Sequence, residues 1–413
     1  MLVWLIKDGE TLPIQAGTRR MRTGLLAAEL VHRGHSVFWW SSTFSHQRKV
    51  LLCDHDCEVK IEPSFTLKLV HAGSYRNHIS FQRYRHHRVL AHRFRQQAET
   101  MPKPDVIVSA FPTIDLAYEA SQYARSRRVP IIVDIRDLWP DVFIDKTPRF
   151  LQWLARILLT GEFNKTKYLL RSANSLVAVS QGYLNWSLRH AGRQQVESDK
   201  LFYIGFPDAI ASEHEASVRI QSLRERVAGK VVFVFIGSFG YSYELDLVCE
   251  VARRMLAMKL DHIHFVLVGD GQQFDTISRK AATLPNITLT GWLNQAELSD
   301  VLAISDVGLV PCLSVADTLP NKPFEYLSAG LPVLSSLEGE MAQIISDHEV
   351  GYSYSCGDAT SLCDYIVKLA EDSALRQRLA RNSKVLFESR FRAEVIYSTY
   401  ASHIEQIVDK YHV

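Results

Sequence analysis

A lysine and two carboxylates that could handle a phosphorylated sugar lie close together in the segment from Asp317 to Val333. The middle of this segment has the pattern of a short helix that ends at Gly330, before a buried strand. The start of a helix offers free N–H groups and partial positive charge to a phosphate, and Lys322 adds a full charge there. Glu325, one turn into the helix, can accept hydrogen bonds from a diol such as ribose, and Asp317 can reach hydroxyls further out. These residues are therefore expected to bind the diphosphate, ribose and sugar of a nucleotide sugar.

A glycine-rich loop, Gly237-Ser238-Phe239-Gly240, follows the apolar run 231–236 and precedes a helix expected from about Glu244. Glycines let a backbone approach a diphosphate closely, and a tight turn without a ligand is the alternative interpretation. The next residues, 241–244, contain no basic side chain, so Lys322 must carry more of the phosphate neutralisation.

In the first half of the chain, two charged residues follow a predicted buried strand that ends near Ile135. Asp137 could orient a hydroxyl group or accept a proton, and Arg136 could hold a phosphate or carboxylate as a bidentate fork. The alternative is an Arg–Asp ion pair that caps the strand.

The segment 316–336 resembles the signature of retaining family-4 glycosyltransferases, Glu-x7-Glu followed by a small-residue helix and Gly-x-Pro-Val, with Asp317 in place of the first Glu. Pro320 to Gly330, together with Asp-x-Arg-Asp-Leu-Trp-Pro at 134–140, resembles the subgroup that builds bacterial surface polysaccharides. Many members of the family have His-Asp at the position of Arg136-Asp137, so this chain departs from them at the expected catalytic site.

The resemblance implies roles for individual residues. The implied catalytic residues are Asp137, Arg136, Lys322 and Asp317. The implied donor-binding residues are Gly237, Ser238, Phe239, Gly240, Gly269, Trp292, Leu293, Thr318, Leu319, Pro320, Asn321, Lys322 and Glu325. The backbone at Trp292 and Leu293 would pair with the nucleobase, with core packing as the alternative for Trp292. The implied acceptor-binding residues are Gly17, Thr18 and Arg19, with a helix N-cap as the alternative for Thr18.

Short apolar runs alternate with amphipathic helical patterns in two series of similar length, which predicts parallel sheets covered by helices on both faces. The fold class expected from the resemblance is α/β of the GT-B type, with two doubly wound Rossmann-like domains facing a central cleft. We place an acceptor-side domain at 1–205 and a donor domain at 206–390. A C-terminal helix at 391–413 would return to the first domain.

The function implied by the resemblance is transfer of a sugar, with retention, from a nucleotide diphosphate sugar (UDP as the favoured nucleotide) to a polyprenyl-diphosphate-linked saccharide. No cofactor and no metal are expected, because Lys322 and backbone amides would stabilise the leaving diphosphate. Asp54-His55-Asp56 looks like a metal-binding Asp-x-Asp motif, but it lies in the half of the chain that does not bind the donor.

Lys and Arg outnumber Asp and Glu in the first half of the chain, and the reverse holds in the second half. Six arginines and four histidines lie between Arg76 and Arg95 with aromatic residues and no acid, which predicts contact with an anionic membrane surface rather than nucleic acid. The amphipathic segment 148–159 could lie in a membrane interface, although core packing is slightly favoured. Six scattered cysteines and no signal peptide favour a cytoplasmic protein, peripheral on the inner face of the cytoplasmic membrane.

Two other functions stay open. A nucleotide-sugar epimerase of the same fold would release UDP or isomerise the sugar without an acceptor. A binding protein for anionic polymers would use the basic segment, but it leaves the Asp317–Glu325 pattern unexplained.

Overall fold

The computed structural model covers the 413-residue chain and describes residues 1–14, 20–77, 80–207, 216–313 and 319–412. The chain forms two compact units: unit 1 consists of Met1–Tyr203 and Ile396–Val413, and unit 2 consists of Ile204–Val395. The predicted boundaries, after residues 205 and 390, lie a few residues from these. The last helix, α16 (Ala393–His412), belongs to unit 1 from Ile396 onward.

Among the described residues of unit 1, eight strands form one sheet in the order β10-β9-β8-β7-β1-β2-β6-β5, parallel except for β5 against β6. The strands are β1 (Leu2–Ile6), β2 (Ser36–Ser42), β5 (Cys57–Glu62), β6 (Phe65–Val70), β7 (Val106–Phe111), β8 (Ile131–Ile135), β9 (Ser175–Ala178) and β10 (Lys200–Leu201). A small antiparallel ribbon is formed by β3 (Phe44–Ser45) and β4 (Val50–Leu51).

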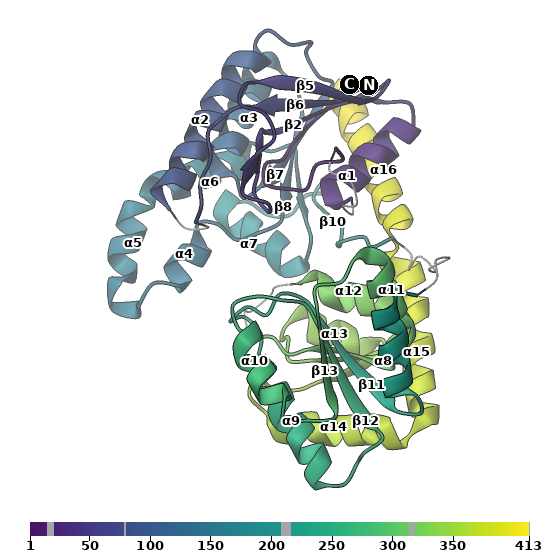
Figure 1. Ribbon diagram of the computed structural model, residues 1–413. Coiled ribbons are helices and arrows are strands. Elements are labelled where there is room, and N and C mark those ends of the chain that lie inside the picture. The colour runs from purple at the N-terminus through teal and green to yellow at the C-terminus, as the bar shows by residue number, and fades with distance from the viewer. Residues whose placement is uncertain (15–19, 78–79, 208–215, 314–318, 413) are drawn as a thin grey trace. The chain divides into compact units, whose positions relative to one another are not determined.

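Helices cover both faces of this sheet: α2 and α3 lie side by side on one face, and α1 and α16 lie together on the other (Figure 1). The helices, besides α16, are α1 (Arg22–His32), α2 (Phe81–Ala98), α3 (Ile114–Arg127), α4 (Asp141–Asp145), η1 (Arg149–Leu151), α5 (Gln152–Leu158), α6 (Thr160–Ser172) and α7 (Gln181–Ala191). On α16, His403 contacts Ser175 at 2.9 Å and Tyr400 stacks on Phe202, which fixes the C-terminal helix to unit 1.

The basic segment of α2 is only partly a surface feature. Leu90 and Phe94 are buried, and Phe94 packs edge-on against Trp40 with the ring centroids 5.1 Å apart. Arg93 pairs with Asp56, so that this carboxylate of the Asp-x-Asp motif has a structural partner. Arg76, Arg85 and Arg88 are exposed to solvent. The predicted aromatic stripe is therefore divided between the core and the surface.

In the described part of unit 2, six parallel strands are ordered β13-β12-β11-β14-β15-β16. The strands are β11 (Val231–Ile236), β12 (Ile263–Val268), β13 (Ile287–Gly291), β14 (Val307–Val310), β15 (Val333–Ser335) and β16 (Gly351–Ser353). The helices are α8 (Val218–Val227), α9 (Leu245–Ala257), α10 (Phe274–Ala281), α11 (Gln295–Ala303), α12 (Asn321–Ser328), α13 (Glu340–Asp347), α14 (Ala359–Glu371), α15 (Ser373–Leu386) and η2 (Phe387–Phe391).

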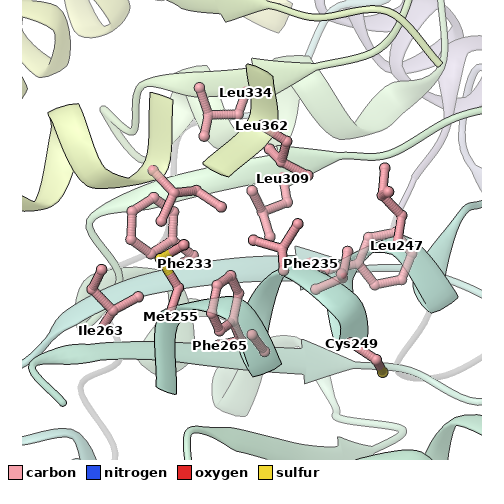
Figure 2. Packing of buried hydrophobic residues seen from close by; sticks show 14 of the residues in the cluster. Phe233, Phe235, Leu247, Cys249, Met255, Ile263, Phe265, Leu309, Leu334 and Leu362 are labelled. Carbon is pink, nitrogen blue, oxygen red and sulfur yellow. The ribbon is translucent and has the colours of Figure 1, made fainter. Parts of the chain in front are cut away.

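The core of unit 2 explains why β11 is apolar at every position. Phe233 and Phe235 of β11 point into a cluster with Phe265 of β12 and with side chains of α9, such as Met255 (Figure 2). The intervening residues of β11, among them Val234, are buried as well. A strand that is buried on both faces reads as a continuous apolar run rather than as an alternating one.

Both strand orders reverse direction at an inner strand. In unit 2 the chain moves outward from β11 on both sides, and in unit 1 it does so from β1. Loops at the carboxyl ends of neighbouring strands diverge at such a point and leave room for a ligand. In unit 2 these loops follow β11 and β14, and in unit 1 they follow β1 and β7.

The segment 148–159 does not pack in the core, so the core interpretation favoured from sequence is wrong. Phe150, Trp153, Ile157 and Leu158 are exposed to 74%, 63%, 60% and 75%. Figure 1 shows α5 at the outer edge of unit 1, away from its sheet. Periodicity alone predicts an apolar face but not what covers it.

A buried ion network connects α1 to the end of β8. Arg22 donates to both carboxylate oxygens of Asp134 at 2.9 and 3.0 Å, and to the carbonyl oxygens of Phe202 and Tyr203. Arg136 also pairs with Asp134 at 2.8 Å. Burial raises the pKa of the Asp134 carboxyl, but the two guanidinium groups outweigh this effect and hold the pKa below its usual value.

We expect Asp134→Ala to lower the free energy of unfolding of unit 1 by about 3–5 kcal/mol, because two guanidinium groups lose their buried partner. Asp54→Ala is the control, since the Asp54 side chain is 90% exposed and should contribute close to nothing. Urea denaturation of both variants measures the difference, and equal midpoints would show that the network does not stabilise unit 1.

Candidate functional site

Tyr326 fixes helix α12 against the sheet of unit 2. Its hydroxyl accepts a hydrogen bond from the N–H of Ile236 in β11 at 2.9 Å and donates to the carbonyl of Leu309 in β14 at 3.1 Å. Gly308 makes room for the ring, because a Cβ atom there would lie 2.3 Å from it. The helix therefore begins at the place where the strand order reverses.

Lys322, the second residue of α12, lies directly over the glycine loop after β11. Its Nζ donates to the hydroxyl of Tyr243 at 2.5 Å and lies 3.8 Å from the centre of that ring. A Cβ atom on Gly237, whose φ is +153°, would come within 2.4 Å of Nζ. Glycine at 237 is thus required both by the backbone conformation and by the approach of the lysine.

The enclosure of Lys322 changes its proton affinity. Burial lowers the pKa of the ammonium group to about 8, although Cys312 and Glu325 act in the opposite direction. Burial also raises the pKa of the Tyr243 hydroxyl to about 12, so this partner stays neutral near pH 7. A partly buried cation whose neighbour in the hydrogen bond is uncharged is suited to an incoming anion such as a diphosphate.

The loops after β11 and β12 are interlocked. Phe239 N–H donates to the Asp270 carbonyl at 2.8 Å, and Gln273 N–H donates to the Phe239 carbonyl at 2.9 Å. A Cβ atom on Gly269 would lie 1.8 Å from the Gly237 carbonyl oxygen. The Phe239 side chain is fully buried, so it anchors the loop, whereas Ser238 is exposed at its tip.

The structure places the other predicted donor residues as follows. Trp292 is 75% exposed, which rules out core packing, and its carbonyl accepts from Arg219 at 3.0 Å. Leu293 is buried. Glu325 is half-buried one turn after Lys322. Leu319 is buried, Pro320 is the N-cap of α12 and Asn321 is its first residue. Asp317, Thr318, Gly17, Thr18 and Arg19 lie outside the described residues.

At the end of β8 in unit 1, Arg136 is committed to internal ion pairs. Besides Asp134, it contacts the Glu10 carboxylate and the Thr23 hydroxyl, both at 2.8 Å. The structure thus supports the ion-pair interpretation of Arg136, and its catalytic role stays a prediction. Asp137 accepts hydrogen bonds from the Leu138 N–H at 2.8 Å and from the indole N–H of Trp139 at 3.1 Å.

Asp137 also lines a polar pocket of about 220 Å³ in unit 1. The pocket lies beside the loops after β1, β7 and β8, where the strand order reverses. Its charged lining residues are Lys7, Asp8, Arg83, Arg136 and Asp137. At such an edge, hydroxyl, imidazole and carboxylate groups can bind sugar hydroxyls, and the cationic groups can bind a phosphate.

Residues 221–385 match the family model described as glycosyl transferases group 1. This match lies entirely within unit 2.

Three known proteins define the likeness further. Sulfoquinovosyl transferase SQD2 of Arabidopsis thaliana is 24% identical over 290 residues, 68% of this chain and 53% of that protein. The aligned part thus spans about half the length of this relative. HepE of Anabaena, crystallised in complex with UDP, has a TM-score of 0.69 at 14% identity and covers 98% of this chain and 99% of its own. WaaG, a glycosyltransferase involved in lipopolysaccharide biosynthesis, has a TM-score of 0.65 at 16% identity over 98% and 99%.

These similarities confirm the predicted α/β fold of the GT-B type, with two Rossmann-like units, and they support a transferase enzyme. Two important residues of the group 1 domain were not predicted from sequence. Tyr243 and Tyr326 contribute through contacts with residues far along the chain, Lys322 and Leu309. The aromatic residues next to the glycine loop and next to Glu325 were visible, but no local pattern indicated their partners.

The pKa of Lys322 predicts how nucleotide binding depends on pH. Below about pH 8 the Lys322 side chain is a charged ammonium group. Above about pH 8 it is mostly neutral, so it must take up a proton when an anionic diphosphate binds. UDP affinity should therefore fall as pH rises from 7 to 9.5, by up to about tenfold per unit for one linked proton. Calorimetric titration measures this dependence.

Lys322→Arg should bind UDP with little dependence on pH, because arginine stays charged throughout this range. Lys280→Met removes an exposed lysine of unit 2 and should keep the wild-type dependence. A wild-type affinity that stays constant between pH 7 and 9.5 would show that Lys322 does not contact the anion.

Proposed function

We propose that this protein is a retaining glycosyltransferase that moves a sugar from a nucleotide diphosphate sugar, with UDP as the favoured nucleotide, to a saccharide acceptor. The observation that carries the proposal is the position of Lys322, enclosed over Gly237 at the start of α12. The group 1 match of unit 2 supports the transfer, and the UDP complex of HepE supports the choice of nucleotide.

In this proposal, unit 2 binds the donor through its backbone and two side chains. The first N–H groups of α12 and the Lys322 ammonium face the diphosphate, and the glycine loop at 237–240 lets the phosphates approach. Negative charge on the diphosphate grows as the bond to the sugar breaks, so these groups stabilise the transition state more than the bound donor. Glu325 accepts hydrogen bonds from the ribose hydroxyls. No metal ion is needed for the leaving group.

The acceptor binds to unit 1 in this proposal, near Asp137. Two hydrogen bonds hold this carboxylate, from Leu138 and Trp139, so that it can orient a sugar hydroxyl at the edge of the polar pocket. We assign Asp317 to the sugar hydroxyls of the donor, and residues 17–19 to the acceptor. The sequence resemblance and the relation to WaaG support an acceptor in bacterial surface polysaccharide biosynthesis, carried on a polyprenyl diphosphate.

We also propose that unit 1 attaches the protein to the inner face of the cytoplasmic membrane. The exposed apolar side chains Phe150, Trp153, Leu154, Ile157 and Leu158 form what we call the α5 apolar surface. The cationic residues Lys146, Arg149 and Arg156 are exposed beside it. No helix in the described ranges is long and apolar enough to cross a bilayer. Attachment would thus combine apolar burial with attraction to anionic lipids, with α2 adding Arg85 and Arg88.

The donor assignment is tested by binding and transfer. UDP at 100 times its dissociation constant should stabilise the protein by about 2.7 kcal/mol, which a thermal shift detects. Glu325→Ala should weaken UDP binding by about 1.5–3 kcal/mol and abolish transfer, because a charged hydrogen bond to ribose is lost. Glu371→Ala, a change of an exposed glutamate in the same unit, should do neither.

Transfer is measured with UDP, GDP, TDP and CMP sugars, with and without EDTA, and we expect EDTA to leave the rate unchanged. Isomerised sugar, or UDP released at the same rate without an acceptor, would support an epimerase instead. Unchanged UDP affinity in Glu325→Ala would remove this residue from the ribose site.

Membrane attachment is tested by co-sedimentation with vesicles of graded anionic lipid content. At 1 M salt the Debye length is about 3 Å, so electrostatic attraction is screened and only apolar burial keeps the protein on the vesicles. Replacing both Ile157 and Leu158 by serine should therefore release most of the protein under these conditions. Arg85→Glu with Arg88→Glu should weaken binding at low salt. Val218 and Val385, exposed on unit 2, provide the matched serine control. If the bound fraction were the same with and without the changes at 157 and 158, the proposed role of α5 would be contradicted.

A further inference from the structure

An apolar pocket of about 190 Å³ adjoins the polar pocket of unit 1. It lies between the first turns of α2, α3 and α6 and the segment that leads into α4. Arg83, His87 and Trp139 line both pockets, so these three side chains form the junction between them.

The walls of this pocket favour an apolar ligand such as a hydrocarbon chain. Its apolar lining consists of Ile114, Trp139, Pro140, Phe143 and Leu159. The two carboxylates at its rim are already engaged, because Lys165 donates to Asp115 at 2.5 Å and to Glu162 at 3.3 Å. Burial lowers the pKa of His87 to about 3, so its imidazole is neutral near pH 7.

The junction, in contrast, is cationic. The Arg83 guanidinium lies 4.9 Å from the centre of the Trp139 ring and 5.8 Å from that of Tyr75. The Lys49 ammonium lies 4.9 Å from the same Tyr75 ring. Burial and the charge of Arg83 lower the pKa of Lys49. The Arg83 guanidinium, which lines both pockets, thus places a positive charge where an anionic group of a ligand can bind.

The carboxylates of the polar pocket have hydrogen-bonding partners of their own. Asp8 accepts from the Ser42 N–H at 3.2 Å and lies 3.6 Å from His86. Asp137 accepts from Leu138 and Trp139. A ligand that spans the two pockets therefore meets apolar walls on one side, the Arg83 guanidinium at the junction, and hydrogen-bonding groups beyond.

We propose that the apolar pocket binds the first isoprene units of a polyprenyl-diphosphate acceptor, with its phosphates against Arg83 and its saccharide in the polar pocket. This inference rests on the proposed function, which requires an acceptor but does not locate its lipid. A volume of 190 Å³ is below the roughly 300–1,000 Å³ of pockets for drug-sized ligands, so one short chain segment fits and the remainder stays outside.

The position of α5 agrees with this assignment. The helix ends at Leu158, next to the pocket residue Leu159, so the α5 apolar surface leads to the pocket along the chain. A prenyl chain that leaves a bilayer at α5 would enter the pocket without exposing its apolar atoms to water.

Farnesyl diphosphate, a soluble short prenyl diphosphate, is the probe, and inorganic diphosphate is the comparison. We expect farnesyl diphosphate to bind the full chain at least about tenfold more tightly, since two or more buried methylene groups supply this much. Ile114→Trp fills the pocket and Leu159→Gln places an amide in it. Both should remove this advantage and leave the affinity for inorganic diphosphate unchanged. Arg83→Met should weaken both ligands.

Matched controls separate the pocket from its surroundings. Val196→Gln changes an exposed apolar residue of unit 1 outside the pocket, and Arg189→Met changes an exposed arginine of α7; both should bind like wild type. UDP affinity, measured for every variant, reports on the integrity of the fold. Equal wild-type affinities for the two diphosphates, or full farnesyl diphosphate binding by both Ile114→Trp and Leu159→Gln, would overturn the proposal.

Lysophosphatidic acid is the second comparison. If it binds as tightly as farnesyl diphosphate, the pocket does not select a prenyl diphosphate and the proposal is wrong. A protein that binds UDP but not farnesyl diphosphate refutes this inference alone. If the protein binds farnesyl diphosphate but neither UDP nor any nucleotide sugar, the proposed function is refuted, whereas the prenyl-binding site is still supported.

Discussion

The contact of Tyr326 with Gly308 is the constraint on which the donor-side arrangement depends. The ring occupies the space of a missing Cβ atom, and its hydroxyl bridges β11 and β14. Because the hydroxyl is buried, losing either partner would leave a polar group unsatisfied, which costs more than the bond itself contributes. The start of α12 is therefore held at a fixed height above the sheet, with Lys322 over Gly237. If the helix began elsewhere, Lys322 would not lie over Gly237, and the lysine and the glycine loop could not contact the same ligand.

In unit 1, buried ion pairs position the residues near the candidate site, whereas in unit 2 side-chain packing positions α12. Arg22, Asp134 and Arg136 are buried together with Glu10, and they tie α1 to the end of β8. Removing one member of such a buried network is costly, because its partners are left as unpaired buried charges. It leaves Asp137 and Trp139, the next residues along the chain, at the wall of the polar pocket. Both residues of the Arg-Asp sequence line this pocket, and the arginine also belongs to the ion network.

Local patterns predicted much of this structure. The alternation of apolar runs and amphipathic segments predicted two parallel sheets, and Gly330 correctly marked the end of α12. Contacts between distant segments were not predictable in this way. The pairing of Lys322 with Tyr243 joins residues 79 positions apart, and the pairing of Arg22 with Asp134 joins residues 112 apart. The surroundings of an apolar residue were also hidden, because periodicity does not separate Phe94, which is buried, from Phe150, which is exposed.

The claim that Lys322 recognises a diphosphate is tested most directly by comparing UDP with uridine. Calorimetric titration of the wild type and of Lys322→Met separates the phosphate contribution from that of the base and ribose. We predict that Lys322→Met weakens UDP binding at pH 7 by about 1.5–3 kcal/mol and leaves uridine binding unchanged. An equal loss for UDP and uridine, or no loss for UDP, would contradict this account of the site.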